Sequence, residues 1–487
     1  MTMHRGRSQR GVAFAYLGIT LFALVGFTGL AVDLGRSYVI KSNLSKAVDA
    51  AALAAARTIG EGQSAARDEA NKIFNVNFRN GYLGVTSVQN PPLIDFSVAA
   101  DDSNVITVSS RAVLPTTFMQ IAGFTNINVS ASGQATRRLV DVAFVVDHSG
   151  SLSSEYDAVK SAAQQFVSYF DPDKDRVALV MFATSTVIMD PINTGAHGFD
   201  KSSLLNHIGG DGIAFVSTAT AEGLYAGWDQ LRSVSSGSQA GLRVIVLFTD
   251  GAPNTFSGQF SVKPCHGCAG ALVPATGALF TNDYPPPSGT PKPAVTGLGQ
   301  IYGTPSDASL HYVQLSPPTG GTGSNYTSGA NSNYQVVNQD IPSLPLVSFH
   351  PTHASSGIPT GFNLYDSSLP GQRVLVGGNG SGYPDHVQNA NNAARNLAEI
   401  IANAARADTS GSSPIRIYTL GLGDLLNQPA GSALETGTSI LMRIANDPAS
   451  PSFNPSQAEG KYYFAGDTSQ LASAFEAIRN QIIRLSQ

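Results

Sequence analysis

The chain has 487 residues, with 29 Lys or Arg against 34 Asp or Glu, so its formal net charge is −5. This length allows about two or three domains, and a hydrophobic content of 42% is enough to bury a sizeable core. No basic block occurs beyond the extreme N-terminus, which argues against nucleic acid as a partner. Only two cysteines are present, Cys265 and Cys268, so a framework of several disulfides is excluded.

An uncharged apolar run covers residues 11–32. A helix of this length spans about 33 Å, which matches a hydrocarbon core of about 30 Å. The alternative is a cleavable signal peptide, but the run is longer than a typical signal core and lacks an A-x-A site at its end. Arg5, Arg7 and Arg10 precede the run, so the positive-inside rule places residues 1–10 in the cytoplasm. We therefore expect a single transmembrane helix over residues 11–35, with the rest of the chain exported.

A stalk helix and a strand region are expected over residues 36–138. Strand-like alternation occurs in IDFSV, NVITVSSRAV and INVSASGQAT. The helical pattern continues past the apolar run, and small residues fall on one of its faces: Ala47, Ala50, Ala51, Ala54 and Ala55. This face indicates either a simple stalk or a helix that packs closely on a partner helix. The second interpretation would allow a homo-oligomer through the stalk helix.

The N-terminal region resembles that of the TadG-like Flp (tight-adherence) pilus-assembly proteins. The resemblance rests on two segments, AVDLGRSYVIKSNLSKAVDAAALAAAR and VLPTTFMQIAGFTNINVSASGQATRR, and covers about residues 11–138. It implies a bacterial inner-membrane protein with a role in pilus assembly or surface adhesion. Pilin-type processing would require a Glu five residues after a cleavable Gly. Tyr16 stands at that distance from Gly11, so we expect no prepilin cleavage.

Strands and helices alternate from residue 139 onward, which predicts an α/β fold with a doubly wound parallel sheet. We expect strands at 139–146, 177–182, 242–249, 415–420 and 461–464. We expect helices at 153–170, 218–231, 386–407, 439–445 and 471–485. The domain would have a first part at 139–253 and a second part at 385–487, separated by an insertion at 254–384. Its ligand site should lie beyond the carboxyl ends of the strands.

Oxygen-bearing side chains gather at these strand ends. Asp147 and Asp250 each close a predicted strand, which places them at the same edge of the sheet. Ser149 and Ser151 alternate with Asp147, so a short extended turn can direct three oxygens to one point. Thr218 stands at the start of a predicted helix. Five oxygens, two of them from carboxylates, suit a hard cation such as Mg²⁺.

This arrangement resembles the metal-ion-dependent adhesion site (MIDAS) of von Willebrand factor A (VWA) domains. The shared features are Asp-x-Ser-x-Ser after a strand, a Thr before a later helix, and a strand that ends in Thr-Asp-Gly. The resemblance implies that Mg²⁺ or Mn²⁺ is held by Asp147, Ser149, Ser151, Thr218 and Asp250. Ser217 or Thr220 would replace Thr218 if the loop shifted. The alternative is that Ser151 only caps a helix and Asp250 only closes a turn.

Two carboxylates and three hydroxyls only just neutralise a divalent ion, so the ion would remain electrophilic. We therefore expect it to capture a Glu or Asp from a partner protein, and we interpret the domain as a binding module rather than an enzyme. Asp147, His148 and Ser149 are the residue types of a hydrolytic triad, but adjacent residues cannot orient one another, and the Gly-x-Ser-x-Gly elbow is missing. We expect His148 at the surface, on the rim of the site.

The insertion at 254–384 holds 16 of the 27 prolines and few charges. It leaves the strand end that carries Asp250, so our hypothesis is that it covers or extends the metal face; the alternative is a passive decoration. Within it, Cys265 and Cys268 are expected to form a short-loop disulfide in an oxidising compartment. Free thiols are one alternative. Another is a zinc site made by Cys265, Cys268, His350 and His353.

The sequence thus predicts a membrane-anchored module that binds a protein through a divalent cation. Its partner would offer an acidic residue and would be a pilus-assembly component or a surface ligand. The alternative is a structural, pseudopilin-like component that acts through its transmembrane and stalk helix, with the metal site incidental.

Overall fold

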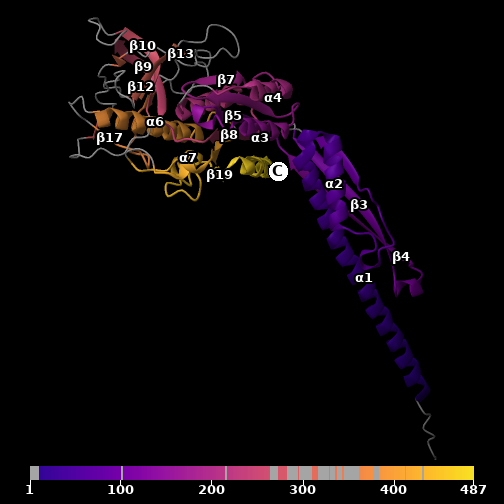
Figure 1. Cartoon of the computed structure of the whole chain (residues 1–487). Helices are drawn as coiled ribbons and strands as arrows, with labels where there is room; N and C mark the ends of the chain where they lie inside the picture. The colour runs from indigo at the N-terminus through magenta and orange to yellow at the C-terminus, as the bar shows by residue number, and fades with distance from the viewer. Residues whose placement is uncertain are drawn as a thin grey trace, which may run out of the picture. The chain divides into compact units, whose positions relative to one another are not determined.

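The computed structural model divides into two compact units, one ending at Arg137 and the other running from Arg138 to Ser486 (Figure 1). The structure describes residues 10–99, 103–213, 217–263 and 383–486, apart from 412 and 430–432. Between 264 and 382 it describes only 273–281, 294–295, 310–315, 328–329, 335–336, 343–344 and 361–376. Each unit has a hydrophobic core of its own.

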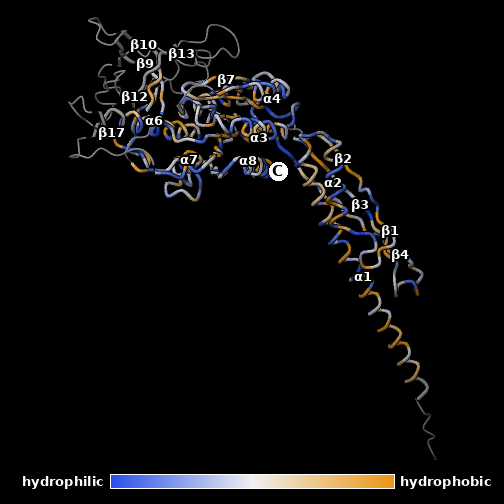
Figure 2. The backbone as a smooth tube through the Cα atoms, in the orientation of Figure 1, coloured by the Kyte–Doolittle hydropathy of each residue, from blue (hydrophilic) through white to orange (hydrophobic). Residues whose placement is uncertain are grey.

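The first unit is built on one continuous helix, α1 (Arg10–Thr58), of 49 residues. It joins the predicted transmembrane and stalk segments without a break. Among the described helices, α1 is long and apolar enough to cross a membrane, with a window of mean hydropathy 2.0 that is only 6% buried. Figure 2 shows this apolar stretch as the orange part of the tube towards the N-terminus.

The C-terminal part of α1 packs against α2 (Gln63–Asn77) and an antiparallel sheet. Short 3₁₀ turns lie at Ile59–Glu61 and Tyr82–Gly84. The long strand β3 (Asn104–Pro115) pairs with β4 (Asn126–Arg137) along its whole length. It also pairs with β2 (Leu93–Val98) and β1 (Ser87–Val88). Buried residues alternate along β3, as expected for a sheet with one face on a core.

The small-residue face of α1 lies inside this unit. Ala47, Ala51 and Ala55 are fully buried in the core that α1 forms with α2 and the sheet. The expectation of a helix that packs closely on a second helix is met within the chain itself, by α2. Ala50 and Ala54 of the same face are only half-buried, and a homo-oligomer through the stalk helix stays a prediction.

The second unit contains a six-stranded sheet in the order β19-β18-β8-β5-β6-β7. The strands are β5 (Val140–Asp147), β6 (Arg176–Phe182), β7 (Thr186–Asp190), β8 (Leu242–Thr249), β18 (Ile415–Leu422) and β19 (Lys461–Ala465). All are parallel except β7, which pairs antiparallel with β6. Every residue of β5, β6 and β8 is buried, as expected for strands covered on both faces.

Helices cover both faces of this sheet, which confirms the doubly wound α/β fold. One core holds Ala143 and Val145 of β5 with α5 (Thr220–Ser233), α6 (Tyr383–Arg406) and α7 (Gly437–Ala445). The other holds Val142 and Phe144 with α3 (Tyr156–Ser168), α4 (Lys201–Gly210) and α8 (Leu471–Ser486). The 3₁₀ turn Gly150–Leu152 precedes α3, which therefore begins later than predicted. β7 and α4 were not predicted.

Part of the insertion is folded into this unit. A five-stranded antiparallel sheet has the order β13-β12-β10-β9-β14; its strands are Ser328–Gly329, Leu310–Leu315, Val273–Thr281, Thr255–Lys263 and Gln335–Val336. Two short ladders pair β11 (Ala294–Val295) with β17 (Leu375–Val376), and β15 (Ser343–Leu344) with β16 (Phe362–Asn363). Cys265, Cys268, His350 and His353 lie outside the described residues, so the disulfide and the zinc site stay predictions.

The described parts of the insertion contribute to the core that lies between the sheet and α5, α6 and α7. Phe256, Leu279, Phe362 and Leu375 are buried in the same cluster as α5 and α6. As a result α5 is buried on all its sides from Thr220 to Leu231, whereas a surface helix keeps one polar face exposed. At these positions the insertion is therefore a structural part of the domain, while its proposed role at the metal face stays a prediction.

Candidate metal-binding site

The two predicted carboxylates lie at one edge of the parallel sheet. β5 and β8 are neighbours, and Val146 lies opposite Phe248, so Asp147 ends its strand at the level of Thr249. Asp250 follows directly. Asp147 is fully buried and Asp250 is 8% exposed. Strand pairing thus brings together two side chains that are about a hundred residues apart in the sequence.

Hydrogen bonds link four of the five predicted residues; three are joined through their side chains, and Asp147 is joined to them through a backbone N–H. The Ser149 N–H donates to Asp147 Oδ1 at 2.8 Å. Ser151 Oγ donates to Asp250 Oδ1 at 2.8 Å, and Ser149 Oγ lies 3.1 Å from Ser151 Oγ. Since Ser151 is exposed while the others are buried, this network of oxygens reaches the surface at Ser151.

Thr218 approaches the same edge from a loop. It lies just before α5, which begins at Thr220, and not on the helix as predicted. A Cβ placed on Gly251 would lie 3.3 Å from Thr218 Oγ1, so the hydroxyl is beside the Asp250–Gly251 turn. Ser217 instead donates its hydroxyl to Thr184 Oγ1 at 2.9 Å, which favours Thr218 over Ser217 as the ligand.

The electrostatics of the site favour a cation. Burial raises the pKa of Asp147. Burial and the neighbouring Asp147 carboxylate together raise the pKa of Asp250 to about 7. Two like charges held in a buried site are unfavourable, and a positive ion between them would offset both the burial and the repulsion.

The donor chemistry also fits a hard divalent ion. In the described part of the chain, no group of three or more His, Cys, Asp or Glu side chains is placed to hold a metal. A metal at this edge would therefore be bound by two carboxylates together with hydroxyl oxygens. An oxygen-only donor set is the type that Mg²⁺ and Mn²⁺ prefer.

His148 is not at the surface as we expected. Only 8% of it is exposed, and its Nδ1 lies 3.0 Å from Asp211 Oδ2. The same carboxylate oxygen accepts a hydrogen bond from the Tyr156 hydroxyl at 2.5 Å. His148 thus ties the end of β5 to the residue that follows α4.

Two residues that position the site were not predicted. Thr249 Oγ1 donates to Asp147 Oδ2 at 2.5 Å, which fixes the second oxygen of that carboxylate. Asn254 Oδ1 accepts the Thr218 N–H at 2.8 Å, and the Asn254 N–H donates to the Thr218 carbonyl at 3.3 Å. Thr249 lay inside the quoted Thr-Asp-Gly motif. Asn254 stands only four residues after Asp250, but we had assigned it to the insertion.

Residues 141–264 match the family model of the von Willebrand factor type A domain. This part of the chain is a VWA domain. Residues 11–58 match the model of the putative Flp pilus-assembly TadE/G-like family. Both families noted in the sequence are thus confirmed, the first over residues 11–58, while the MIDAS itself stays a prediction. Such domains are generally adhesion or assembly modules. No curated protein matches the chain.

Solved structures with a similar arrangement include the proximal thread matrix protein 1 from the mussel byssus. It shares 12% identity over 71% of this chain and 46% of that protein, with a TM-score of 0.30. A mutant of the PilB minor pilin from Streptococcus sanguinis shares 14% identity over 82% of this chain and 81% of the pilin, with a TM-score of 0.36. The vWF domain of the type V pili tip protein Mfa5 from Porphyromonas gingivalis shares 17% identity over 72% of this chain and 98% of that domain, with a TM-score of 0.34. The match to the mussel protein spans less than half of its length.

Proposed function

We propose that this protein is a membrane-anchored module that binds a protein partner through a divalent cation, in Flp pilus assembly or surface adhesion. The observation that carries the proposal is the oxygen network of Asp147, Ser149, Ser151 and Asp250, which begins at two buried carboxylates and reaches the surface at Ser151. A buried pair of carboxylates is unfavourable unless a cation lies between them. A cation that also binds a partner must be accessible from the surface, and the exposed Ser151 lies at that point.

The cation would be Mg²⁺ or Mn²⁺, held by Asp147, Ser149, Ser151, Thr218 and Asp250. When bound, it would supply an open coordination position for a Glu or Asp carboxylate of the partner. The chain prepares its donors in advance, because Thr249 orients Asp147 and Asn254 orients Thr218. Donors held by such supporting hydrogen bonds lose little freedom when they bind an ion.

The anchor would be α1, in a bacterial inner membrane. Arg5, Arg7 and Arg10 precede the apolar run, so the N-terminus would stay in the cytoplasm. The VWA domain would then face the periplasm or the cell exterior, where pilus components and surface ligands are found. The rival function, a pseudopilin-like stalk that polymerises, has less support because Ala47, Ala51 and Ala55 of the alanine face are buried within the chain itself.

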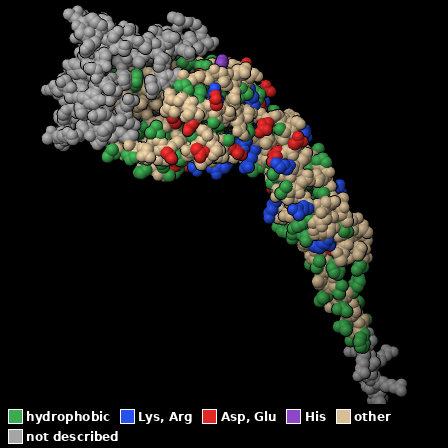
Figure 3. Space-filling model, in the orientation of Figure 1, with side chains coloured by type: hydrophobic (Ala, Val, Ile, Leu, Met, Phe, Trp, Pro, Cys, Tyr) green, Lys and Arg blue, Asp and Glu red, His purple; other side chains and the backbone are tan. Residues whose placement is uncertain are grey.

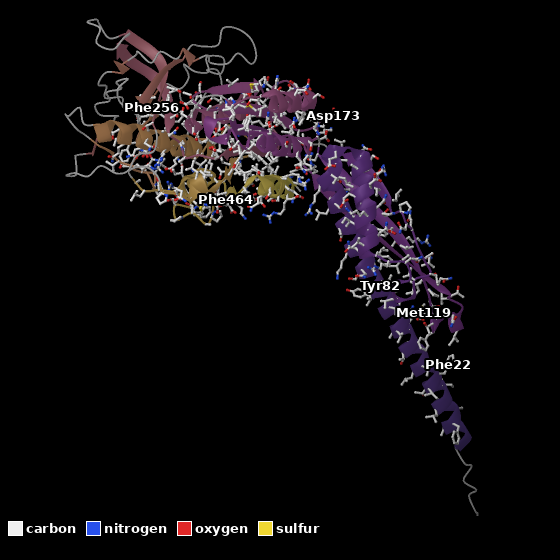
Figure 4. The ribbon with its side chains drawn as sticks, in the orientation of Figure 1. Phe22, Tyr82, Met119, Asp173, Phe256 and Phe464 are labelled. Carbon is white, nitrogen blue, oxygen red and sulfur yellow. The ribbon has the colours of Figure 1, made fainter. Side chains whose placement is uncertain are left out.

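Capture of partners by the full-length protein tests the proposal. Purified pilus-assembly proteins and surface extracts are offered to the wild type in Mg²⁺, to the wild type in EDTA, and to Asp147→Ala in Mg²⁺. The matched control is Asp173→Asn, which changes an exposed carboxylate in the same unit (Figure 4). We expect a partner that is retained only by the wild type and by Asp173→Asn in Mg²⁺. Equal retention in every arm would contradict a metal-bridged contact, and circular dichroism would verify that Asp147→Ala is folded.

A further inference from the structure

The turn between β3 and β4 ends in an apolar tip. A 3₁₀ turn, Met119–Ala122, closes the hairpin. Around it, Phe118, Ile121 and Phe124 are 38%, 76% and 60% exposed. No charged residue occurs between Arg111 and Arg137, so the whole end of the hairpin is uncharged. Exposed apolar clusters of this kind commonly mark a protein or membrane contact.

The tip contacts α1 within the apolar run of residues 11–32, and not in the part of the helix that follows this run. Gly29 belongs to the uncharged residues 11–32, and a Cβ placed on it would lie 2.5 Å from Phe118 Cβ. Phe118 therefore lies directly on the helix at Gly29, about 4 to 5 Å before the run ends at Val32. Figure 4 shows Met119 of the same turn beside α1, with Phe22 farther along the helix. Figure 3 shows hydrophobic side chains gathering along this narrow end, beyond the last blue and red ones.

A buried carboxylate fixes the tip to the helix. Asp33 is 1% exposed and accepts hydrogen bonds from three successive backbone N–H groups, those of Thr117, Phe118 and Met119, at 3.0, 2.8 and 2.8 Å. One turn later, Arg36 donates to Thr117 Oγ1 at 3.0 Å and to the Leu83 carbonyl at 2.8 Å. The charge that follows the apolar run is thus satisfied by the hairpin and shielded from its surroundings.

We propose that the β3–β4 tip, formed by Phe118, Ile121 and Phe124, is a second membrane contact that enters the lipid bilayer beside α1. The lipid surface is the favoured occupant because the tip is continuous with the apolar run and lies at the depth of Gly29. This inference rests on the proposed membrane anchoring of α1. Apolar side chains of interfacial segments reach roughly 5–10 Å into the boundary between headgroups and acyl chains. A hairpin held there would set the depth and the tilt of α1.

Tryptophan quenching by brominated lipids in liposomes tests the proposal on the full-length protein. The chain has one tryptophan, Trp228, which is buried in the other unit, so the wild type gives the unquenched baseline. We expect Ile121→Trp and Phe124→Trp to lose emission when the acyl chains are brominated close to the headgroup. The matched control is Leu93→Trp. Leu93 is 61% exposed and pairs with Ser109, about 20 Å along the sheet from Pro115, where β3 ends before the tip.

A fourth variant, Phe22→Trp, separates this inference from the anchoring on which it rests. Phe22 lies in the middle of the apolar run and is 75% exposed. Quenching of Phe22→Trp without quenching at positions 121 and 124 would overturn the tip contact and leave the anchor standing. A tip tryptophan shielded both from brominated lipid and from aqueous iodide would also overturn it, in favour of a protein cover. Because Phe22 would lie near the bilayer centre, Phe22→Trp is measured with lipids brominated deep in the acyl chains. If it is not quenched there, both the anchor and the tip contact are wrong.

Discussion

Asn254 holds Thr218 by two hydrogen bonds, one that its side chain accepts and one that its backbone donates. The first comes from the Thr218 N–H at 2.8 Å, and Thr218 is itself only 5% exposed. The loop before α5 is thereby tied to the segment that follows Asp250. A proposed metal ligand on one loop is positioned by a residue that does not itself belong to the ligand set.

We therefore predict that Asn254→Ala weakens Mn²⁺ binding without removing a ligand. Loss of a supporting hydrogen bond of this type typically costs about 10–100-fold in metal affinity. The substitution would also leave the buried Thr218 N–H without its acceptor, which should lower the free energy of unfolding by about 1–3 kcal/mol. Isothermal titration with Mn²⁺ measures the affinity. Asn480→Ala, on the exposed side of α8, is the control, and equal affinities in both variants would exclude the positioning role.

Asp250→Asn should separate binding from stability. The substitution removes one of two buried carboxylates that repel each other, yet an amide oxygen still accepts the hydrogen bond from Ser151. We expect the metal-free variant to be more stable than the metal-free wild type, by on the order of 1–2 kcal/mol. We also expect it to gain much less from Mg²⁺. Chemical unfolding with and without Mg²⁺ measures both effects, and a less stable metal-free variant would count against the repulsion.

A separate ion pair predicts a pH dependence in the VWA domain. Asp408 accepts hydrogen bonds from Trp228 Nε1 at 2.5 Å and from Arg232 Nη1 at 2.8 Å. Although burial opposes ionisation, these bonds and those from Ser410 lower the pKa of Asp408 to about 2. Because the unfolded carboxyl titrates near 3.9, its contribution is present above that pH and is lost as the pH falls towards 2.

Asp408→Asn should accordingly cost on the order of 2 kcal/mol at pH 7. The difference between the variant and the wild type should shrink as the pH falls from 4 to 2. Trp228 fluorescence follows urea unfolding at each pH, and Asp173→Asn serves as the exposed control. If the difference in free energy of unfolding between variant and wild type stays constant down to pH 2, the charge of Asp408 does not contribute to stability, and its effect comes from packing.

The insertion should stabilise the domain through its buried side chains. Phe256 is fully buried while Phe464 is 38% exposed, and both are labelled in Figure 4. We predict that Phe256→Ala lowers the free energy of unfolding by about 3–5 kcal/mol, and that Phe464→Ala has a much smaller effect. Thermal unfolding compares the two variants. This test is cleaner than removing residues 254–384, because such a deletion would open the core and could abolish binding for that reason alone.

The fold was largely predictable because its central strands are continuous apolar runs. β8 has the bounds predicted from the sequence, and β5 differs by one residue at each end. The meeting of Ser151 and Asp250, 99 residues apart, follows from the rule that parallel strands end at one edge. In contrast, β7 is a half-buried edge strand and α4 buries only Leu204 and Ile208, so neither has a strong pattern.

The contacts that the sequence could not reveal join residues without a shared motif. His148 is buried, and its ring nitrogen Nδ1 lies within hydrogen-bond distance of the carboxylate of Asp211, 63 residues later. Nothing in the Asp147-His148-Ser149 run indicates that partner. The apolar residues of the insertion show no periodicity that separates core positions from turns. Phe256 and Leu375 are buried in the same core as α6, and α6 begins more than a hundred residues after Phe256.

The unbroken course of α1 from Arg10 to Thr58 has a mechanical consequence. A straight helix of 49 residues is about 73 Å long, and the sheet of the first unit is fastened to it at Asp33, at Arg36 and along the alanine face. Rotation of the apolar segment of α1 about its own axis and rotation of that sheet are therefore coupled. If the apolar segment is anchored in a bilayer as proposed, torque or tension applied to the sheet would reach it through continuous helix, because no break in α1 separates the two.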